Sequence, residues 1–217
     1  MKTKQFQLAL GGICALALTM QSAKALTYTL TAPNSDISGY GAPFGTVNVT
    51  LNSANSATIT FTAGSSGAYN YLFGDGGSVA LNVNGAVTSY SIGSFTQPQS
   101  PTQTPSYTQA SGNEDGFGNF NFQLNDFDGY QHAVSSLTFT ITTSSTWSTV
   151  NDVLAANANN LVVGAHIFVV NTDWSNTGNT GYAAGSTPSV PDGGSTVALL
   201  GCALAGVGAV GRQFRKR

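Results

Sequence analysis

The stretch Val79-Ala80-Leu81-Asn82-Val83-Asn84-Gly85-Ala86-Val87-Thr88-Ser89-Tyr90 carries the pattern that decides the fold class. Apolar and polar residues alternate on both sides of Asn84-Gly85, and a period of two is typical of β-strands. Asn-Gly supplies the positive φ angles that a two-residue type I′ turn needs, so the stretch predicts a β-hairpin. In this hairpin Val79 would lie opposite Tyr90, and the apolar side chains would share one face.

Short alternating runs of the same kind recur along the chain, and turn residues bound them. The expected strands cover residues 27–31, 46–51, 57–62, 79–83, 86–92, 119–124, 137–142 and 162–170. About eight strands without sustained helical periodicity predict an all-β domain, an antiparallel β-sandwich. Residues 95–116 are expected to form a long loop because they are rich in Pro, Gln and Ser, and residues 149–158 a short helical connector.

Residues 1–25 have the three parts of a secretory signal peptide. Two lysines form a positive start, residues 8–20 form a short apolar run, and Ala23 and Ala25 are the small residues that signal peptidase reads. An uncleaved anchor helix is the alternative, but the apolar run is too short to span a bilayer comfortably. The sequence therefore predicts export, processing by signal peptidase and a mature protein that begins at Leu26.

Charge is distributed unevenly along the chain. All seven lysines and arginines lie near its two ends, whereas residues 26–211 contain all nine acidic residues and no lysine or arginine. This region is a polyanion at neutral pH and would repel a phosphate backbone, which excludes nucleic acid as a partner. Cations, neutral glycans and protein surfaces remain possible binding partners. Cys14 and Cys202 lie in the apolar ends, so no disulfide is expected in the domain.

A second three-part signal occupies residues 190–217, where a Pro/Gly-rich element precedes an apolar stretch at 197–211 and a basic tail at 212–217. As a helix the apolar stretch would be about 22 Å long, against a hydrocarbon core of about 30 Å. Bilayer thinning and snorkelling basic side chains can make up the difference, so a transmembrane helix is expected. The basic tail would stop transfer in the cytoplasm and leave the acidic domain outside. Its basic residues are Arg212, Arg215, Lys216 and Arg217.

The element before the apolar stretch consists of Val190, Pro191, Asp192, Gly193, Gly194, Ser195 and Thr196. Together with the helix and the basic tail, it resembles the PEP-CTERM sorting signal in its VPD-type variant. It departs from that variant by Gly193 in place of serine, and from the parent motif by Asp192 in place of glutamate. The resemblance implies recognition by an exosortase in bacteria that make an extracellular polysaccharide matrix. An ordinary tail anchor would keep the same topology and lose only the processing.

The region between the two signals is similar to the ectodomain commonly found before PEP-CTERM anchors. The similar segments are a Gly-Phe-Gly strand at 116–118, a Leu-x-Phe strand at 137–139, Ala165-His166-Ile167 and a Thr-Gly-Tyr end at 180–182. This resemblance implies no known activity. The ectodomain is expected to cover residues 26–184, with a linker at 185–189.

Acidic residues near the middle of the chain are the candidates for a metal site. Asp126-Phe127-Asp128-Gly129 looks like the start of a calcium loop, but Leu137 stands where an EF-hand needs a glutamate. A calcium site that is not an EF-hand remains one interpretation. The alternative is that these acidic side chains lie in loops and are solvated. The ligands of such a site would be Glu114, Asp115, Asp126 and Asp128. No other cofactor is expected.

His166 is the main candidate for catalytic chemistry, and it lies in an apolar run on the same face as Phe168 and Val170. A single histidine there is expected to be a hydrogen-bonded core residue rather than a ligand. A catalytic histidine also needs a nucleophile and an orienting acid in space. The sequence has no Gly-x-Ser-x-Gly elbow and no His-Glu-x-x-His motif, so we expect no enzyme activity.

The sequence as a whole predicts an exported, exosortase-sorted protein of the cell surface or extracellular matrix. The C-terminal helix would hold it in the membrane until processing. A structural, non-catalytic role is the first interpretation. The alternative is a carbohydrate-binding module associated with exopolysaccharide, in which Trp147, Trp174 and Tyr182 could stack on sugars. A secreted hydrolase is a third interpretation without a positive feature.

Overall fold

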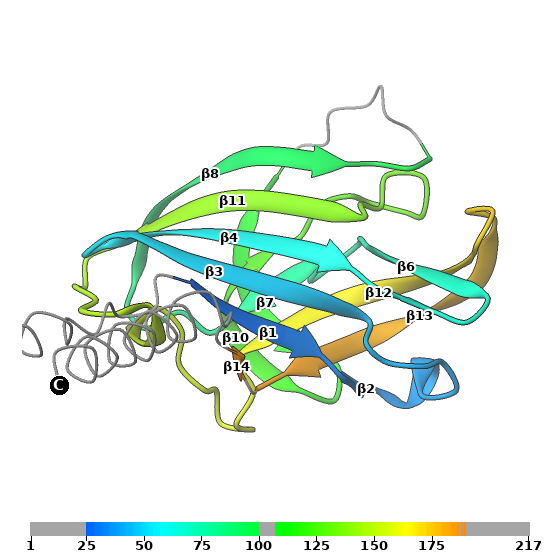
Figure 1. The fold of residues 1–217 in the computed structure, drawn as a ribbon, viewed down its shortest axis with the longest axis horizontal. Coiled ribbons are helices and arrows are strands. Elements are labelled where there is room, and N and C mark those ends of the chain that lie inside the picture. The colour runs from blue at the N-terminus through cyan, green and yellow to red at the C-terminus, as the bar shows by residue number, and fades with distance from the viewer. Residues whose placement is uncertain (1–24, 100–106, 187, 190–217) are drawn as a thin grey trace, which may run out of the picture. The chain divides into compact units, whose positions relative to one another are not determined.

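Two antiparallel sheets make up the part of the chain that the computed structural model describes, residues 25–99, 107–186 and 188–189 (Figure 1). The six-stranded sheet has the strand order β14-β1-β3-β4-β11-β8. The eight-stranded sheet has the order β2-β13-β12-β7-β10-β9, with β6 also on β12 and β5 on β6. The prediction of an all-β, antiparallel domain is confirmed.

The strands include every one of the eight predicted from the sequence, with shifted ends. The six-stranded sheet consists of β1 (Ala25–Leu30), β3 (Gly45–Ser53), β4 (Ser56–Ala63), β8 (Val87–Thr96), β11 (Ser136–Thr143) and β14 (Pro188–Ser189). The eight-stranded sheet consists of β2 (Ala32–Pro33), β5 (Ser65–Ser66), β6 (Tyr69–Phe73), β7 (Val79–Leu81), β9 (Gln109–Glu114), β10 (Gly118–Leu124), β12 (Val163–Asn171) and β13 (Asn176–Gly185). Two short 3-10 helices, η2 (Ser35–Ile37) and η3 (Val150–Asp152), lie in connections.

The core lies between the two sheets. Alternation in β4 and β11 turns every second side chain inward, and these inward residues are fully buried. The ring of Phe61 in β4 meets that of Phe73 in β6 at a centroid distance of 5.8 Å. Phe139 of β11 stacks on Phe122 of β10 at 5.6 Å. Each pair joins the two sheets, so the domain is a β-sandwich packed by aromatic side chains.

The prediction of a β-hairpin around Asn84-Gly85 is wrong. β7 pairs with β10 and β12 in the eight-stranded sheet, whereas β8 pairs with β11 in the six-stranded sheet. All three residues of β7 are buried, and neighbours on both sides leave no edge for β8. Gly85 has a φ of +116°, but Asn84 does not have the positive φ of a type I′ turn. The chain at this point crosses from one sheet to the other.

Three further expectations differ from the structure. The expected loop at 95–116 contains the end of β8 and all of β9. The expected linker at 185–189 contains the last residue of β13 and the strand β14, which pairs with β1. The expected helical connector at 149–158 is reduced to η3, where Thr149 and Asp152 form a capping box.

The membrane-related predictions fall on other parts of the chain. Among the residues that the structure describes, no helix has the length and apolar character needed to cross a bilayer. The predicted helix at 197–211 lies outside the described residues, as do residues 1–24 of the signal peptide.

We expect the melting temperature of the domain to be the same with and without dithiothreitol. Both cysteines, Cys14 and Cys202, lie outside the sequence of the sandwich, so its core contains no disulfide. Thermal unfolding followed by near-ultraviolet circular dichroism checks this. A melting temperature that falls in the reducing sample would contradict it.

Candidate functional site on the outer face of the eight-stranded sheet

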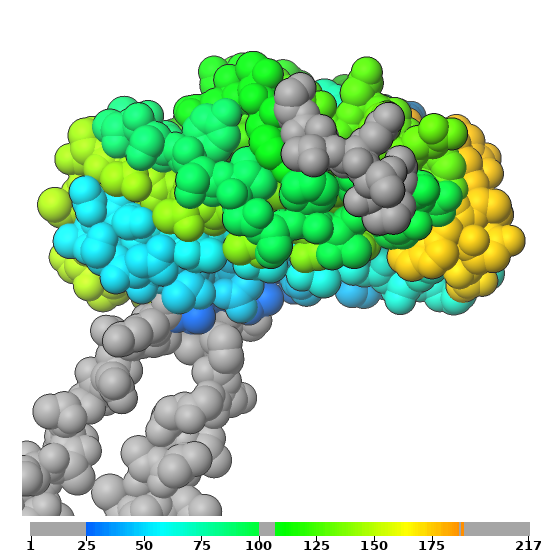
Figure 2. All heavy atoms as spheres, turned by 90° about the horizontal axis from the view of Figure 1, so that it is seen from above, coloured from blue at the N-terminus to red at the C-terminus, as the bar shows by residue number. Residues whose placement is uncertain are grey.

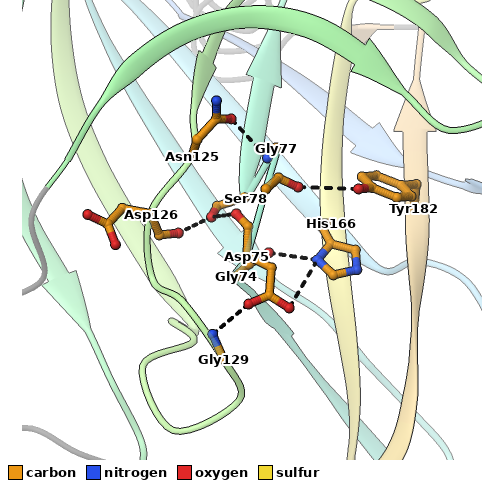
Figure 3. Close-up of polar contacts among 10 residues, drawn as sticks. Gly74, Asp75, Gly77, Ser78, Asn125, Asp126, Gly129, His166 and Tyr182 are labelled. Atoms are coloured by element: carbon orange, nitrogen blue, oxygen red, sulfur yellow. Dashed lines mark hydrogen bonds and ion pairs between the residues drawn. The ribbon is translucent and has the colours of Figure 1, made fainter.

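His166 of β12 lies on the outer face of the eight-stranded sheet, beneath the loop that joins β6 to β7 (Figure 3). It is only 7% exposed, and its Nδ1 lies 2.8 Å from the carbonyl oxygen of Gly74. A carbonyl oxygen only accepts, so Nδ1 carries the hydrogen. Burial lowers the pKa of His166, against the opposing effects of the Gly74 hydrogen bond and the Asp75 charge. The predicted burial and hydrogen bonding of His166 are therefore confirmed, although the residue lies on the outer face of the sheet and not in the core between the sheets.

The loop at residues 74–78 is tied to the loop at 125–129 by hydrogen bonds (Figure 3). Asp75, which has a positive φ of 59°, accepts a 2.5 Å hydrogen bond from the backbone N–H of Gly129. The side-chain oxygen of Asn125 accepts the N–H of Gly77 at 2.9 Å. The Ser78 hydroxyl is fully buried and hydrogen-bonds to the carbonyl oxygens of Asp75 and Asp126. These polar groups hold two loops together.

The geometry does not form a nucleophile–base pair at this place. The Asp75 carboxylate lies 3.9 Å from His166 Nδ1, which already points at the Gly74 carbonyl. The Ser78 hydroxyl is bound to backbone carbonyls and not to the imidazole. Serine, histidine and aspartate therefore occur close together without the hydrogen-bond chain of a catalytic triad.

Glu114 lies fully buried at the end of β9, beneath the same loop. Gln123 of β10 donates to its Oε1 at 2.5 Å, while its Oε2 has no hydrogen-bond partner. Burial raises the pKa of Glu114 to about 8, and the Gln123 hydrogen bond only partly opposes this. A Cβ on Gly77 would lie 2.2 Å from Oε1, so a glycine is needed above the carboxyl group. Sequence reasoning gave no signal for this burial.

Tyr182 of β13 closes the site on one side. Its ring lies 4.7 Å from that of His166, and its hydroxyl donates to the Gly76 carbonyl at 3.3 Å. Burial raises the pKa of Tyr182, and the charges of Glu114, Asp115 and Asp75 raise it further. The ring of Tyr182 thus packs against a buried histidine, and sugar stacking by this residue stays a prediction.

The four predicted calcium ligands occupy different environments. Glu114 is buried against Gln123, whereas Asp115 and Asp128 are exposed and Asp126 is half-buried. Across residues 25–99, 107–186 and 188–189, no three His, Cys, Asp or Glu side chains are grouped so that they could hold a metal ion. The calcium site stays a prediction.

If Asp126 and Asp128 contribute to a calcium site, millimolar Ca²⁺ is expected to raise the melting temperature of the wild-type protein. A ligand that binds only the native state stabilises it by about 2.7 kcal/mol at a hundred times its dissociation constant. The double variant Asp126→Asn, Asp128→Asn should then lose the shift, and Mg²⁺ at equal ionic strength serves as the control. A melting temperature that Ca²⁺ leaves unchanged in the wild type would retire the site.

The two tryptophans have different roles. Trp147 is 2% exposed, and its Nε1 donates to the Asn84 carbonyl at 2.9 Å, so it is a core residue. Trp174 is half-buried in the turn between β12 and β13. The segment that contains this turn lies at one end of the domain (Figure 2). Its φ is +66°, which is unusual for a bulky residue. Tyr130 and Gln99 hydrogen-bond to its carbonyl oxygen, so the backbone here is held in place.

The processing residues lie at the limits of the described chain. Ala25 is the first residue of β1 and pairs with Thr50, and the inward side chain of Leu26 is buried. A cut after Ala25 would thus leave the core side chains of β1 in the mature protein. Ala23, the sorting element at 190–196 and the basic residues at 212–217 lie outside the described residues.

Comparison with known families identifies the C-terminal segment. The family described as VPDSG-CTERM motif matches residues 189–214, beginning at the last residue of β14. This segment is a PEP-CTERM-like exosortase sorting signal, and it indicates an exported, exosortase-sorted protein. The match includes none of residues 26–184, so the resemblance of these residues to PEP-CTERM ectodomains stays a prediction. No curated protein and no solved structure matches the chain.

Proposed function

We propose that this chain is a non-catalytic protein of the cell surface or extracellular matrix, which exosortase releases from its membrane anchor. The observation that carries the proposal is the position of the sorting signal. The matched segment starts at Ser189, the last residue of β14, so all of the sandwich except this residue precedes the matched segment in the chain. A domain in that place is the part that stays on the surface after the signal has been processed.

The polar groups of the described site support a structural role. The side chains of Asp75, Ser78 and His166 are all bound to backbone groups of neighbouring loops. A general base must lie within hydrogen-bond reach of the proton that it takes from a substrate. Here the three side chains stabilise the loops that cover the outer face of the eight-stranded sheet.

Location in the native host tests this proposal. Full-length protein should be found in the surface or matrix fraction, and a variant that ends at Ser189 should be found in the medium. Cytoplasmic full-length protein would contradict the proposal. Hydrolysis of a surface polymer by the purified protein would contradict its non-catalytic part, with Ser78→Ala as the control variant.

Carbohydrate binding is the second candidate, and the setting of Trp174 favours it. Its ring and that of Tyr130 are partly exposed and pack on a buried apolar cluster that contains Phe168. Such rings can stack on the faces of sugars. A glycan array with the full-length protein, in a detergent without a sugar headgroup, tests this candidate. Binding that Trp174→Ala abolishes would support it.

A further inference from the structure

Hydroxyl-bearing side chains form rows across the outer face of the six-stranded sheet. The register of β1, β3, β4, β11 and β8 aligns them, and all are at least partly exposed. The strands lie side by side in Figure 1. We call the following residues the threonine face. They are Thr29, Thr46, Thr62, Ser136 and Thr96 in one row, Thr27, Asn48, Thr60 and Thr138 in the next, and Thr50, Thr58, Thr140 and Ser91 in the third.

The threonine face carries no charge, although the domain is a polyanion. Of the acidic residues in the described ranges, none lies in a strand of the six-stranded sheet. Only Glu114 lies in a strand, and that strand is β9 of the other sheet. The charges therefore lie on the other sheet and on the connections. A ligand of the threonine face gains little from ion pairing, so charged polymers have no attraction to it.

Two pairs of hydroxyl groups on this face are joined by hydrogen bonds across neighbouring strands. The hydroxyls of Thr60 and Thr138 lie 3.1 Å apart, and those of Thr58 and Thr140 lie 3.4 Å apart. Threonine is β-branched and stiff at χ1, so binding costs little side-chain entropy. A hydroxyl has one donor and two acceptor positions, so a pair still has capacity for a ligand.

The spacing of the rows is that of the sheet itself. Neighbouring strands lie about 4.8 Å apart, and side chains on one face of a strand recur about every 6.7 Å. The face thus offers a repeating set of hydrogen-bonding groups and methyl groups. Protein interfaces concentrate aromatic residues, methionine and arginine at their centres, and none of these stands in the three rows. A polymer with many neutral hydroxyl groups fits this chemistry better than a protein partner.

We propose that the threonine face binds a neutral polysaccharide through many weak hydrogen bonds. This inference rests on the proposed surface location and names the face and the ligand class. It differs from the Trp174 candidate, because the threonine face contains no aromatic ring. Binding by neutral groups should depend little on salt, whereas attraction between charges is screened as ionic strength rises.

Co-sedimentation with insoluble neutral polysaccharides tests the inference. Full-length protein in a detergent without sugar headgroups would be mixed with cellulose, starch or insoluble β-1,3-glucan. We expect retention on at least one of them that stays within about twofold between about 0.05 and 0.5 M salt. The quadruple variant Thr58→Val, Thr60→Val, Thr138→Val, Thr140→Val should bind at least tenfold more weakly. Valine keeps the shape and the strand preference of threonine.

Three controls keep the outcomes separate. Thr172→Val, in the turn away from the face, should bind as the wild type does, and circular dichroism should show that the quadruple variant is folded. Should that variant not fold, the single variant Thr60→Glu, which adds one charge at the centre of the face, replaces it. Binding that survives in the face variant, or no retention on any neutral polymer, would overturn the inference. Loss of binding only in Trp174→Ala would overturn it too, while leaving carbohydrate binding and surface location intact.

Discussion

Raising the pH from about 6.5 to 8 is expected to destabilise the wild-type domain, and Glu114→Gln is expected to remove most of this effect. Burial raises the pKa of Glu114 to about 8 from an ordinary value of 4.5. The folded state therefore keeps its proton where the unfolded chain has lost it, and stability falls as pH rises between these values. At 1.36 kcal/mol per pKa unit, the loss over the whole interval from pH 4.5 to 8 is on the order of 5 kcal/mol, and at most about 2 kcal/mol of it falls between pH 6.5 and 8.

Below about pH 6.5, His166 has the opposite effect on stability from Glu114. Burial lowers the pKa of His166, so the unfolded chain takes up a proton there first as pH falls below about 6.5, and stability is lost. Above that value Glu114 is the group that changes, which makes pH 6.5 to 8 the cleanest window.

Urea unfolding at a series of pH values measures the effect. Glu114→Gln should be more stable than the wild type at pH 8 and close to it at pH 5, because glutamine is neutral throughout. The neighbouring exposed residue provides the matched control, and Asp115→Asn should keep the wild-type pH dependence. If the free energy of unfolding changed equally with pH in the wild type and in Glu114→Gln between pH 6.5 and 8, Glu114 would not be buried as a neutral acid.

Changing Pro191 and Asp192 to alanine is expected to abolish C-terminal processing without abolishing membrane attachment. Both residues lie in the segment that matches the VPDSG-CTERM motif and before the apolar stretch. We expect the apolar stretch and the basic tail to be sufficient to stop transfer. A proline followed by one acid offers an enzyme a fixed extended backbone and a single charge to recognise. The double variant should therefore be exported and still carry residues 212–217.

Mass spectrometry of the C-terminal peptide distinguishes the two outcomes. In the native host the wild type should lose residues 212–217, and in a host without exosortase it should keep them. The variant Ser186→Ala, which lies before the matched segment and keeps Pro191 and Asp192, is the matched control and should be processed as the wild type is. An intact tail on all wild-type protein from the native host would reduce the segment to a simple anchor.

The strands were predictable because local alternation survives in the fold, but their pairing was not. Val79–Leu81 and Val87–Thr96 were both expected as strands, yet they lie in different sheets. The sequence pattern records which side chains point the same way, whereas partners depend on which edges are free. The strand Asn176–Gly185 was missed because its Asn and Gly residues are typical of turns.

The candidate site was predictable only in part. The burial of His166 followed from its apolar neighbours, and the structure adds the Gly74 carbonyl as its partner. Glu114 was assigned to a possible metal site because acids lie near it in sequence. Its burial depends on Gln123 across a strand pair and on Gly77 in a distant loop. No local pattern around Glu114 contains that information.

The pairing of β14 with β1 sets the mechanical response of a domain that is held at its C-terminal end. β14 is a two-residue strand at the edge of the sheet, and it pairs with β1 in antiparallel register. Tension applied beyond Ser189 would break the hydrogen bonds between β14 and β1 one after another before it reached β13. Release of residues 186–189 would lengthen the tether by about 14 Å at most. The edge strand β14 would therefore detach first. Its detachment would lengthen the tether and leave the rest of the sandwich folded under small forces.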